Sequence, residues 1–432
     1  MPATSTAPAG SSPHQPSDWT YLVGIGGYAV LDTVLQLWLI FFFLPPPNQG
    51  SPLVDPQTFG LAILVGRTIE ALMSPVAGFS SDRLGKPWLF LLGGALVFGL
   101  SSILLFFLPA PGESTRNTLL LFILLPIGLV GQASYIVPYL GLLPRVAMDG
   151  LRRIRLTNSQ ALLILLGVFT GQVVSGLVLK ALGNLPLTVT LFFSLAVSLM
   201  LLPLVRVRSL QTQGSGFAFL EIAGILRRNP GFRALVAAQG LFWLGFNMVR
   251  SVVVYYVTVL LGGSAGDVAL YLGSIFVVTL PSLVLIRFLV PRVGKRRMMM
   301  TATGMLTLIL PLLSTIGANV GPLPAQAWAF GLLALSGFPL AILSAVPNPM
   351  VAEQVDGDAA VTGQNKAALF FGVQALAIKI SAGLAGALLG FLLANFGYSQ
   401  ANPLGIQLVG PIAGLLALAA TVAYSFYPEE VA

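Results

Sequence analysis

Long apolar segments dominate this sequence and restrict what the chain can fold into. Each is long enough for the roughly 20 residues that cross a bilayer as a helix, and a lipid-facing segment must satisfy its backbone hydrogen bonds internally. None shows the alternating pattern of a membrane β-barrel strand. We therefore predict an all-α membrane protein with twelve transmembrane helices, at 19–43, 57–81, 87–108, 117–143, 157–181, 186–205, 232–262, 266–290, 298–317, 324–352, 363–395 and 403–427.

The composition supports this class and excludes several others. Of the 432 residues, 56% are hydrophobic and only 8% charged, whereas soluble proteins carry about a quarter charged residues. With no cysteine and a single histidine, His14, the chain cannot build disulfides, zinc clusters or a Ser-His-Asp triad. It also has no G-x-x-x-x-G-K-[ST] loop for ATP. We expect neither an enzyme nor a cofactor.

The basic residues predict the orientation. Sixteen lie in the loops after the second, fourth, sixth, eighth and tenth spans, and two, Arg116 and Lys180, lie in the loops on the other side. Cytoplasmic loops are rich in Lys and Arg, so we expect a multi-pass protein of the plasma (inner) membrane with both termini in the cytoplasm. The formal charge of +8 is thereby explained by orientation in a lipid bilayer, and no nucleic-acid partner is expected.

The spans form two groups of six. We predict a disordered cytoplasmic tail at 1–18, helical bundles at 19–206 and 232–427, a cytoplasmic linker at 207–231 and a short tail at 428–432. Phe219, Ile222, Ala223 and Leu226 share one helical face in the linker, which predicts an amphipathic surface helix. Similar tetrapeptides stand in equivalent loops, Arg83–Lys86 after span 2 and Arg292–Lys295 after span 8, with Gly294 in the second. This similarity indicates a duplicated six-span unit.

One loop carries a family resemblance. The stretch after span 2 contains Gly78, Asp82, Arg83, Gly85 and Lys86. It resembles the signature loop of the major facilitator superfamily, whose glycines allow a tight turn and whose Asp and Arg can pair between the two halves.

Three further stretches resemble the glycoside–pentoside–hexuronide cation symporters of that superfamily. Span 2 is similar to the family's Arg-x-x-Asp-x-x-x-Asp-Pro pattern, and matches also occur at 137–159 and 369–379. The resemblance implies two bundles, a central cavity and alternating access. This chain differs from the family at four positions. Ser74 replaces the family's second acidic residue on span 2, and Tyr28 replaces an Asp on span 1. Ile136 replaces an Asp on span 4, and Gln160 replaces an Arg on span 5.

Charges inside the spans are the candidate functional groups, because each costs about 2.5–3.5 kcal/mol at the bilayer centre. Arg67, Glu70 and Ser74 share one helical face. Glu70 and Ser74 supply oxygen ligands for Na⁺, or Glu70 takes a proton; a single carboxylate favours the proton. The alternative is a structural Arg67–Glu70 pair.

Two more charges extend this prediction. Lys379 on span 11 is expected to compete with the coupling cation for Glu70; the alternative is a lysine that reaches a headgroup. Asp32, one turn beyond Tyr28, is a candidate proton or substrate ligand, or else pairs with Lys379 or Arg250.

Span 7 offers a candidate substrate surface. Trp243, Asn247 and Arg250 lie on one stripe that could stack on and hydrogen-bond a hydroxylated ligand; the alternative is interfacial packing with Arg250 as a counter-charge. Further cavity candidates are Tyr28, Tyr139, Gln160 and Gln374, whereas Tyr255 and Tyr256 are expected in an aromatic membrane belt.

The combined prediction is a monomeric secondary transporter that moves a sugar or glycoside-like small molecule with H⁺ or Na⁺. One alternative keeps the fold and carries an amphipathic lipid such as a lysophospholipid. Another is a non-transporting membrane scaffold.

Overall fold

The computed structural model describes residues 18–146, 150–207, 220–318, 322–363 and 366–428, and these residues form helices joined by loops, with no strand. The predicted tail residues 1–17, linker residues 208–219 and C-terminal residues 429–432 lie outside the described residues. The first half contains α1 (Asp18–Phe43), α2 (Pro56–Leu84), α3 (Pro87–Phe107), α4 (Thr115–Gly141), α5 (Leu143–Val146), α6 (Gly150–Phe169), η1 (Thr170–Val174), α7 (Ser175–Leu182), α8 (Leu185–Leu201) and α9 (Leu204–Val207).

The second half begins with the linker helix α10. Its elements are α10 (Leu220–Arg228), α11 (Pro230–Tyr255), η2 (Tyr256–Leu260), η3 (Ala265–Asp267), α12 (Val268–Val293), α13 (Lys295–Leu312), η4 (Leu313–Thr315), α14 (Ala325–Leu335), α15 (Gly337–Ala345), α16 (Pro347–Thr362), α17 (Ala367–Phe396), α18 (Leu404–Gln407) and α19 (Val409–Ser425).

Twelve helices or helix runs of the described chain are long and apolar enough to span a membrane, as predicted. The tenth run continues to Thr362, ten residues beyond the expected end, because α16 carries the helix past the apolar segment. Asp18, expected in the tail, opens α1. The linker helix forms; Ile225 is fully buried and Leu226 packs partly buried against the core. Of the predicted stripe, Phe219 lies outside the described residues, as do the side chains of Ile222 and Ala223.

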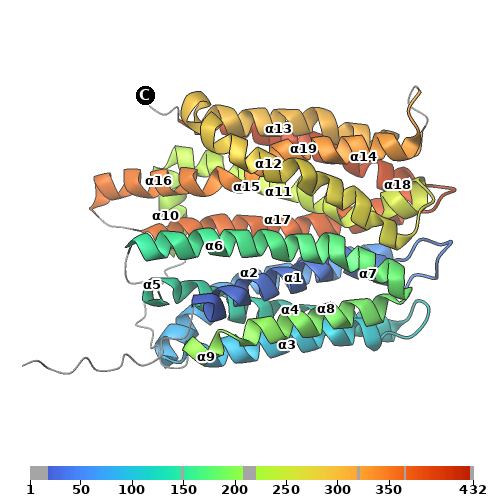
Figure 1. Cartoon of the computed structure of the whole chain (residues 1–432), viewed down its shortest axis with the longest axis horizontal. Helices are drawn as coiled ribbons and strands as arrows, with labels where there is room; N and C mark the ends of the chain where they lie inside the picture. The colour runs from blue at the N-terminus through green and yellow to red at the C-terminus, as the bar shows by residue number, and fades with distance from the viewer. Residues whose placement is uncertain (1–17, 147–149, 208–219, 319–321, 364–365, 429–432) are drawn as a thin grey trace, which may run out of the picture.

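The helices form two bundles that lie side by side (Figure 1). The first bundle runs from α1 to α9 and the second from α11 to α19. They meet where α2 packs on α17, α1 on α11, α7 on η3, and η1 on α12. The first and last described residues lie at the same end of the molecule, on the left of Figure 1, as an even number of spans requires.

Local signals define the helix ends. The Asp55 side chain accepts a hydrogen bond from the Thr58 N–H and caps α2, and Ser114 caps α4 through the Asn117 N–H. Gly85 follows α2 at φ +63° and Gly294 follows α12 at φ +84°, conformations that glycine adopts without steric cost. The two glycines end equivalent spans of the two halves.

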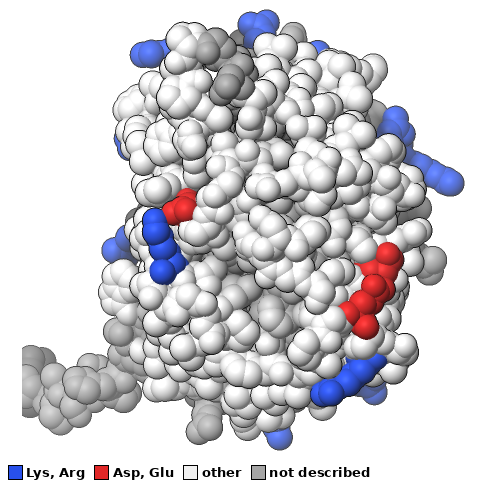
Figure 2. Space-filling view, turned by 90° about the vertical axis from the view of Figure 1, so that its right-hand side faces the viewer, with Lys and Arg blue, Asp and Glu red and all other residues white. Residues whose placement is uncertain are grey.

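The outer surface is apolar. Large side chains such as Leu308 (73% exposed) and Val277 (71% exposed) face outward, which in water would form a continuous apolar patch of the kind that marks an interaction surface. Charged side chains are sparse on the end away from the termini (Figure 2). This surface suits lipid along the flanks and fits the unequal loop charges.

Several contacts close the bundles against each other in the half opposite the termini. Lys180 Nζ lies 2.7 Å from Asp267 Oδ1, and the Tyr255 hydroxyl donates to the Leu44 carbonyl oxygen at 2.6 Å. Tyr255 and Tyr256 are buried, so their predicted place in a membrane belt is wrong. Tyr255 instead connects α11 to the end of α1.

Glycines allow α2 and α17 to approach closely in the same half. A Cβ on Gly60 would lie 2.7 Å from the Gly386 carbonyl oxygen, and one on Gly390 would lie 2.5 Å from the Pro56 carbonyl oxygen. Only a residue without a side chain fits at such backbone contacts.

Candidate functional site

The carboxylate of Glu70 lies between two cations from different bundles. Its Oε2 is 2.8 Å from Arg67 Nη1 on the same helix, and its Oε1 is 2.7 Å from Lys379 Nζ on α17. Lys379 also donates to Ser74 Oγ at 2.6 Å. The Glu70 side chain is 2% exposed, so this is a buried ion triad that connects the two bundles.

Asp32 is the second carboxylate of this region, and its side chain is 20% exposed. It accepts hydrogen bonds from Gln36 Nε2 at 2.6 and 2.7 Å and from Gln132 Nε2 at 2.8 Å. Its nearest cation is Arg67, with Nη2 at 3.9 Å. The expected alternatives, a pair with Lys379 or Arg250, are not formed among the described residues; Arg67 lies between Asp32 and Glu70 and contacts both.

Arg250 is the third cation of this region. Its Nη1 donates to Gln36 Oε1 at 3.1 Å and so connects α11 to α1. Its Nε and Nη2 are buried and find no hydrogen-bond partner among the described residues. With Arg67, Lys379 and Arg250 against Asp32 and Glu70, the region carries one more positive group than negative groups.

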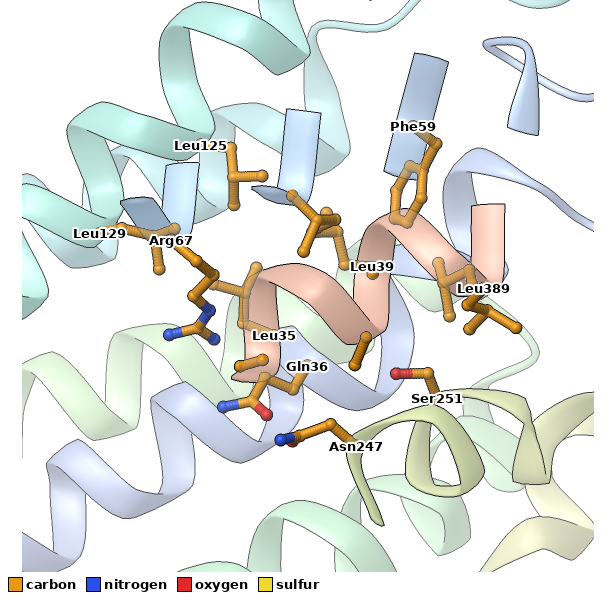
Figure 3. Close-up of a pocket in the computed structure, with 15 residues that line it drawn as sticks. Leu35, Gln36, Leu39, Phe59, Arg67, Leu125, Leu129, Asn247, Ser251 and Leu389 are labelled. Atoms are coloured by element: carbon orange, nitrogen blue, oxygen red, sulfur yellow. The ribbon is translucent and has the colours of Figure 1, made fainter. Parts of the chain in front are cut away.

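A first cavity of about 60 Å³ lies beside this network, between the bundles. Figure 3 shows Arg67, Gln36, Asn247 and Ser251 at its polar side. Apolar residues line the rest of the cavity. Those labelled in Figure 3 are Phe59, Leu35, Leu39, Leu125, Leu129 and Leu389.

A second cavity, of about 160 Å³, lies mainly inside the second bundle. Trp243 and Arg250 line it, as does Gln172 of η1 from the first bundle. Apolar side chains make up most of the remainder, among them Phe242, Phe246, Leu272 and Phe276. The predicted stripe Trp243–Asn247–Arg250 therefore divides, with Asn247 at the first cavity and the other two at the second.

Other predicted substrate residues are packed elsewhere. The Tyr139 ring stacks on Tyr21 at 4.5 Å and its hydroxyl donates to the Tyr21 carbonyl oxygen. Gln374 Nε2 donates to Gln239 at 2.9 Å, and Gln160 is buried with no partner for its Nε2 among the described residues. None of these three lines either cavity. Tyr28 belongs to the network because its hydroxyl accepts from Gln132 Nε2 at 2.9 Å.

The loop residues of the family pattern lie at the end of the molecule that also holds the two chain termini. Gly78 packs near Val137, and Gly85 provides the turn after α2. Asp82 and Arg83 make no ion pair with any other described residue, so the pairing expected between the halves is absent here. In the second half, Lys295 pairs with Glu353 of α16, while Arg83, Lys86 and Arg292 are exposed.

Two residues of the network were not predicted from the sequence. Gln36 joins Asp32 to Arg250, and Gln132 joins Asp32 to Tyr28 and, at 3.5 Å, to Arg67. A signal was available, since Gln36 lies one turn beyond Asp32 and Gln132 lies inside span 4. No group of three or more His, Cys, Asp or Glu gathers in the described part of the chain, and the Na⁺ site at Glu70 and Ser74 remains a prediction.

Comparison with known proteins decides the family. A model described as MFS/sugar transport protein matches residues 20–427. The chain belongs to this family. No curated protein matches it, but this MFS protein is similar in fold to the nucleoside transporter NupG, with a TM-score of 0.66 at 12% identity over 95% of this chain and 99% of that one.

A second solved structure has the same fold. It is a POT family transporter in complex with a thioalcohol-conjugated peptide, with a TM-score of 0.66 at 16% identity over 94% of both chains. At these identities the likeness concerns the fold alone. The family and the two-bundle architecture together make this MFS protein a multi-pass secondary transporter.

Proposed function

We propose that this MFS protein is a cation-coupled symporter of a small glycoside-like molecule, and that Glu70 carries the coupling cation. The observation that supports this is the position of Glu70, buried between Arg67 of its own helix and Lys379 of the other bundle. The loop charges support a plasma-membrane orientation with cytoplasmic termini.

The coupling follows from the two ion pairs. A cation that neutralises Glu70 removes the attraction that holds Lys379, and so weakens the link between α2 and α17. Breaking a buried pair by removing one charge costs about 3–5 kcal/mol, enough to shift a two-state equilibrium strongly. Cation binding and bundle movement are thereby linked through one carboxylate.

The proton fits this geometry better than Na⁺. Both Glu70 oxygens already contact cationic nitrogens, and Ser74 Oγ accepts from Lys379 while it donates to the Glu70 carbonyl oxygen. A proton needs to displace only Lys379 from one oxygen, whereas Na⁺ needs several oxygen ligands. We therefore propose H⁺ as the coupling ion.

The test is uptake into proteoliposomes with an imposed proton gradient, using a panel of radiolabelled sugars and glycosides. Glu70→Gln should abolish accumulation against a concentration gradient, while exchange of cargo across the membrane persists. The matched control is Glu113→Gln, the same change at an exposed residue outside the spans, which should behave as wild type. Undiminished accumulation by Glu70→Gln would overturn the proposal. A strict requirement for Na⁺ would overturn the choice of H⁺ as the coupling ion.

A second cargo class is an amphipathic lipid. It is favoured by one observation, the apolar lining of the second cavity. The same proteoliposomes with a fluorescent lysophospholipid distinguish the two, because a lipid transporter would move the lysolipid and no sugar of the panel.

A further inference from the structure

We propose that the second cavity binds an organic anion, with the anionic group on Arg250 and an apolar body about the size of one aromatic ring. This inference rests on the proposed cation-coupled transport but changes the cargo proposed above, from a neutral glycoside-like molecule to an organic anion. It predicts that an uncharged, fully hydroxylated sugar is a poor ligand.

The first argument is the state of the Arg250 guanidinium. It has one protein partner, the neutral amide of Gln36, and two buried nitrogens without a partner. A buried donor without an acceptor is destabilising, and more so when the group is charged. Guanidinium presents its donors in a planar fork that matches a carboxylate. Arg250 lines this cavity, so a carboxylate that displaces the side chains now covering Nε and Nη2 would supply the missing acceptors.

The second argument is charge. Three cations and two carboxylates leave this buried region with one net positive charge, and buried charges in proteins are normally paired. Arg67 and Lys379 share Glu70, and Asp32 accepts mainly from neutral amides. A single negative charge at Arg250 would complete the balance.

The third argument is the lining of the cavity. Its volume of about 160 Å³ is close to that of an apolar cavity of roughly 150 Å³ that holds benzene. The hydroxyls of Thr279, Ser336 and Ser344 donate to backbone carbonyls of their own helices. These groups are therefore occupied as donors, and a ligand rich in hydroxyls would lose more hydrogen bonds to water than it regains.

The fourth argument is location. Leu165, Val168 and Gln172 reach the cavity from the first bundle, and the other lining residues come from the second. When the bundles rock, these contacts change, so a ligand here binds one state better than the other. That difference is what transport requires.

Binding is tested on the purified full-length protein in detergent by calorimetry and thermal stability. The probes are phenylacetate, its neutral analogue 2-phenylethanol, and lactate as an anion without an apolar body. Phenylacetate should bind saturably and raise Tm, and the other two should bind at least ten-fold more weakly. Equal binding of phenylacetate and 2-phenylethanol would overturn the role of Arg250.

Variants locate the site. Arg250→Gln should raise the Kd for phenylacetate at least ten-fold, about 1.4 kcal/mol, whereas Arg287→Gln removes a charge from an exposed position and should leave Kd unchanged. Val168→Phe keeps Arg250 and fills the cavity, so it should also abolish binding and serves if Arg250→Gln does not fold. Wild-type affinity in Val168→Phe would place the anion elsewhere and overturn the proposal.

The two proposals fail separately. If sugars stabilise the protein and phenylacetate does not, the anion site is wrong and cation-coupled sugar transport stands. If phenylacetate binds as described but Glu70→Gln still concentrates cargo, the anion site stands and the coupling role of Glu70 is wrong.

Discussion

Replacing Gly60 by alanine should open the half of the transporter opposite the termini. The added Cβ would lie 2.7 Å from the Gly386 carbonyl oxygen and 3.1 Å from the Gly390 Cα, compared with 3.4–4 Å for an ordinary contact. Overpacking of this kind costs about 1–3 kcal/mol. Since the clash exists only while α2 and α17 are together at this end, the cost falls on this conformation and shifts the equilibrium away from it by about 5- to 150-fold.

The chain has no cysteine, so a single added thiol reports on this equilibrium without further engineering. Ser251 lines the first cavity between the bundles. In a Ser251→Cys background, Gly60→Ala should raise the rate of labelling by an impermeant maleimide, applied from the side opposite the termini, at least five-fold.

Two glycines of α3 provide the controls. Gly93→Ala adds a methyl group with no atom within 4 Å and should change nothing. Gly94→Ala adds one 2.6 Å from the Tyr135 backbone nitrogen, inside the first bundle, and should lower stability without faster labelling. If Gly60→Ala labels no faster than Gly93→Ala, or if Gly94→Ala gives the same increase, the closure attributed to α2 and α17 is refuted.

Three smaller predictions follow from other contacts. Removing the partly exposed pair between Lys180 and Asp267 should change the opening equilibrium by no more than about 1 kcal/mol, measured by a double-mutant cycle with the same thiol; a larger coupling energy would mean that this pair holds the closed end. Gly85→Ala should lower the free energy of unfolding by about 1–2 kcal/mol, because alanine is strained at φ +63°, and a thermal melt with no decrease would contradict the conformation of this turn. A fluorescent protein fused after Ala432 should fold in the cytoplasm, whereas one inserted beside Arg116 should stay dark; the reverse pattern would invert the orientation.

Hydropathy predicted the spans because each apolar segment is stable in a membrane as a single helix, without tertiary partners. The end of the tenth run was missed for a tertiary reason. Beyond the apolar residues, α16 continues through Glu353, which contacts Lys295 and the Tyr427 hydroxyl of the C-terminal region. Such partners stabilise a polar helix end and leave no mark in the local sequence.

The site was predicted where charge made residues conspicuous. A buried Glu and a buried Lys in different halves are costly alone, and the structure places Glu70 and Lys379 in contact. Gln36 and Gln132 were missed because a neutral amide is far less costly in a span and attracts no attention by itself. The division of the Trp243–Asn247–Arg250 stripe between two cavities could not be predicted, since it depends on how neighbouring helices fill each side of α11.

The two cationic partners of Glu70 lie in different bundles, Arg67 in the first and Lys379 in the second, so a separation of the bundles affects them differently. Arg67 lies on α2 with Glu70, so in the proposed cycle an unprotonated Glu70 keeps one cationic partner when the bundles part. Lys379 belongs to the other bundle and parts from Glu70 and Ser74 together. In the proposed cycle, each separation therefore leaves the Lys379 ammonium group without these two partners. The energetic barrier of the proposed return step would then depend on how well water or an anion stabilises that amine.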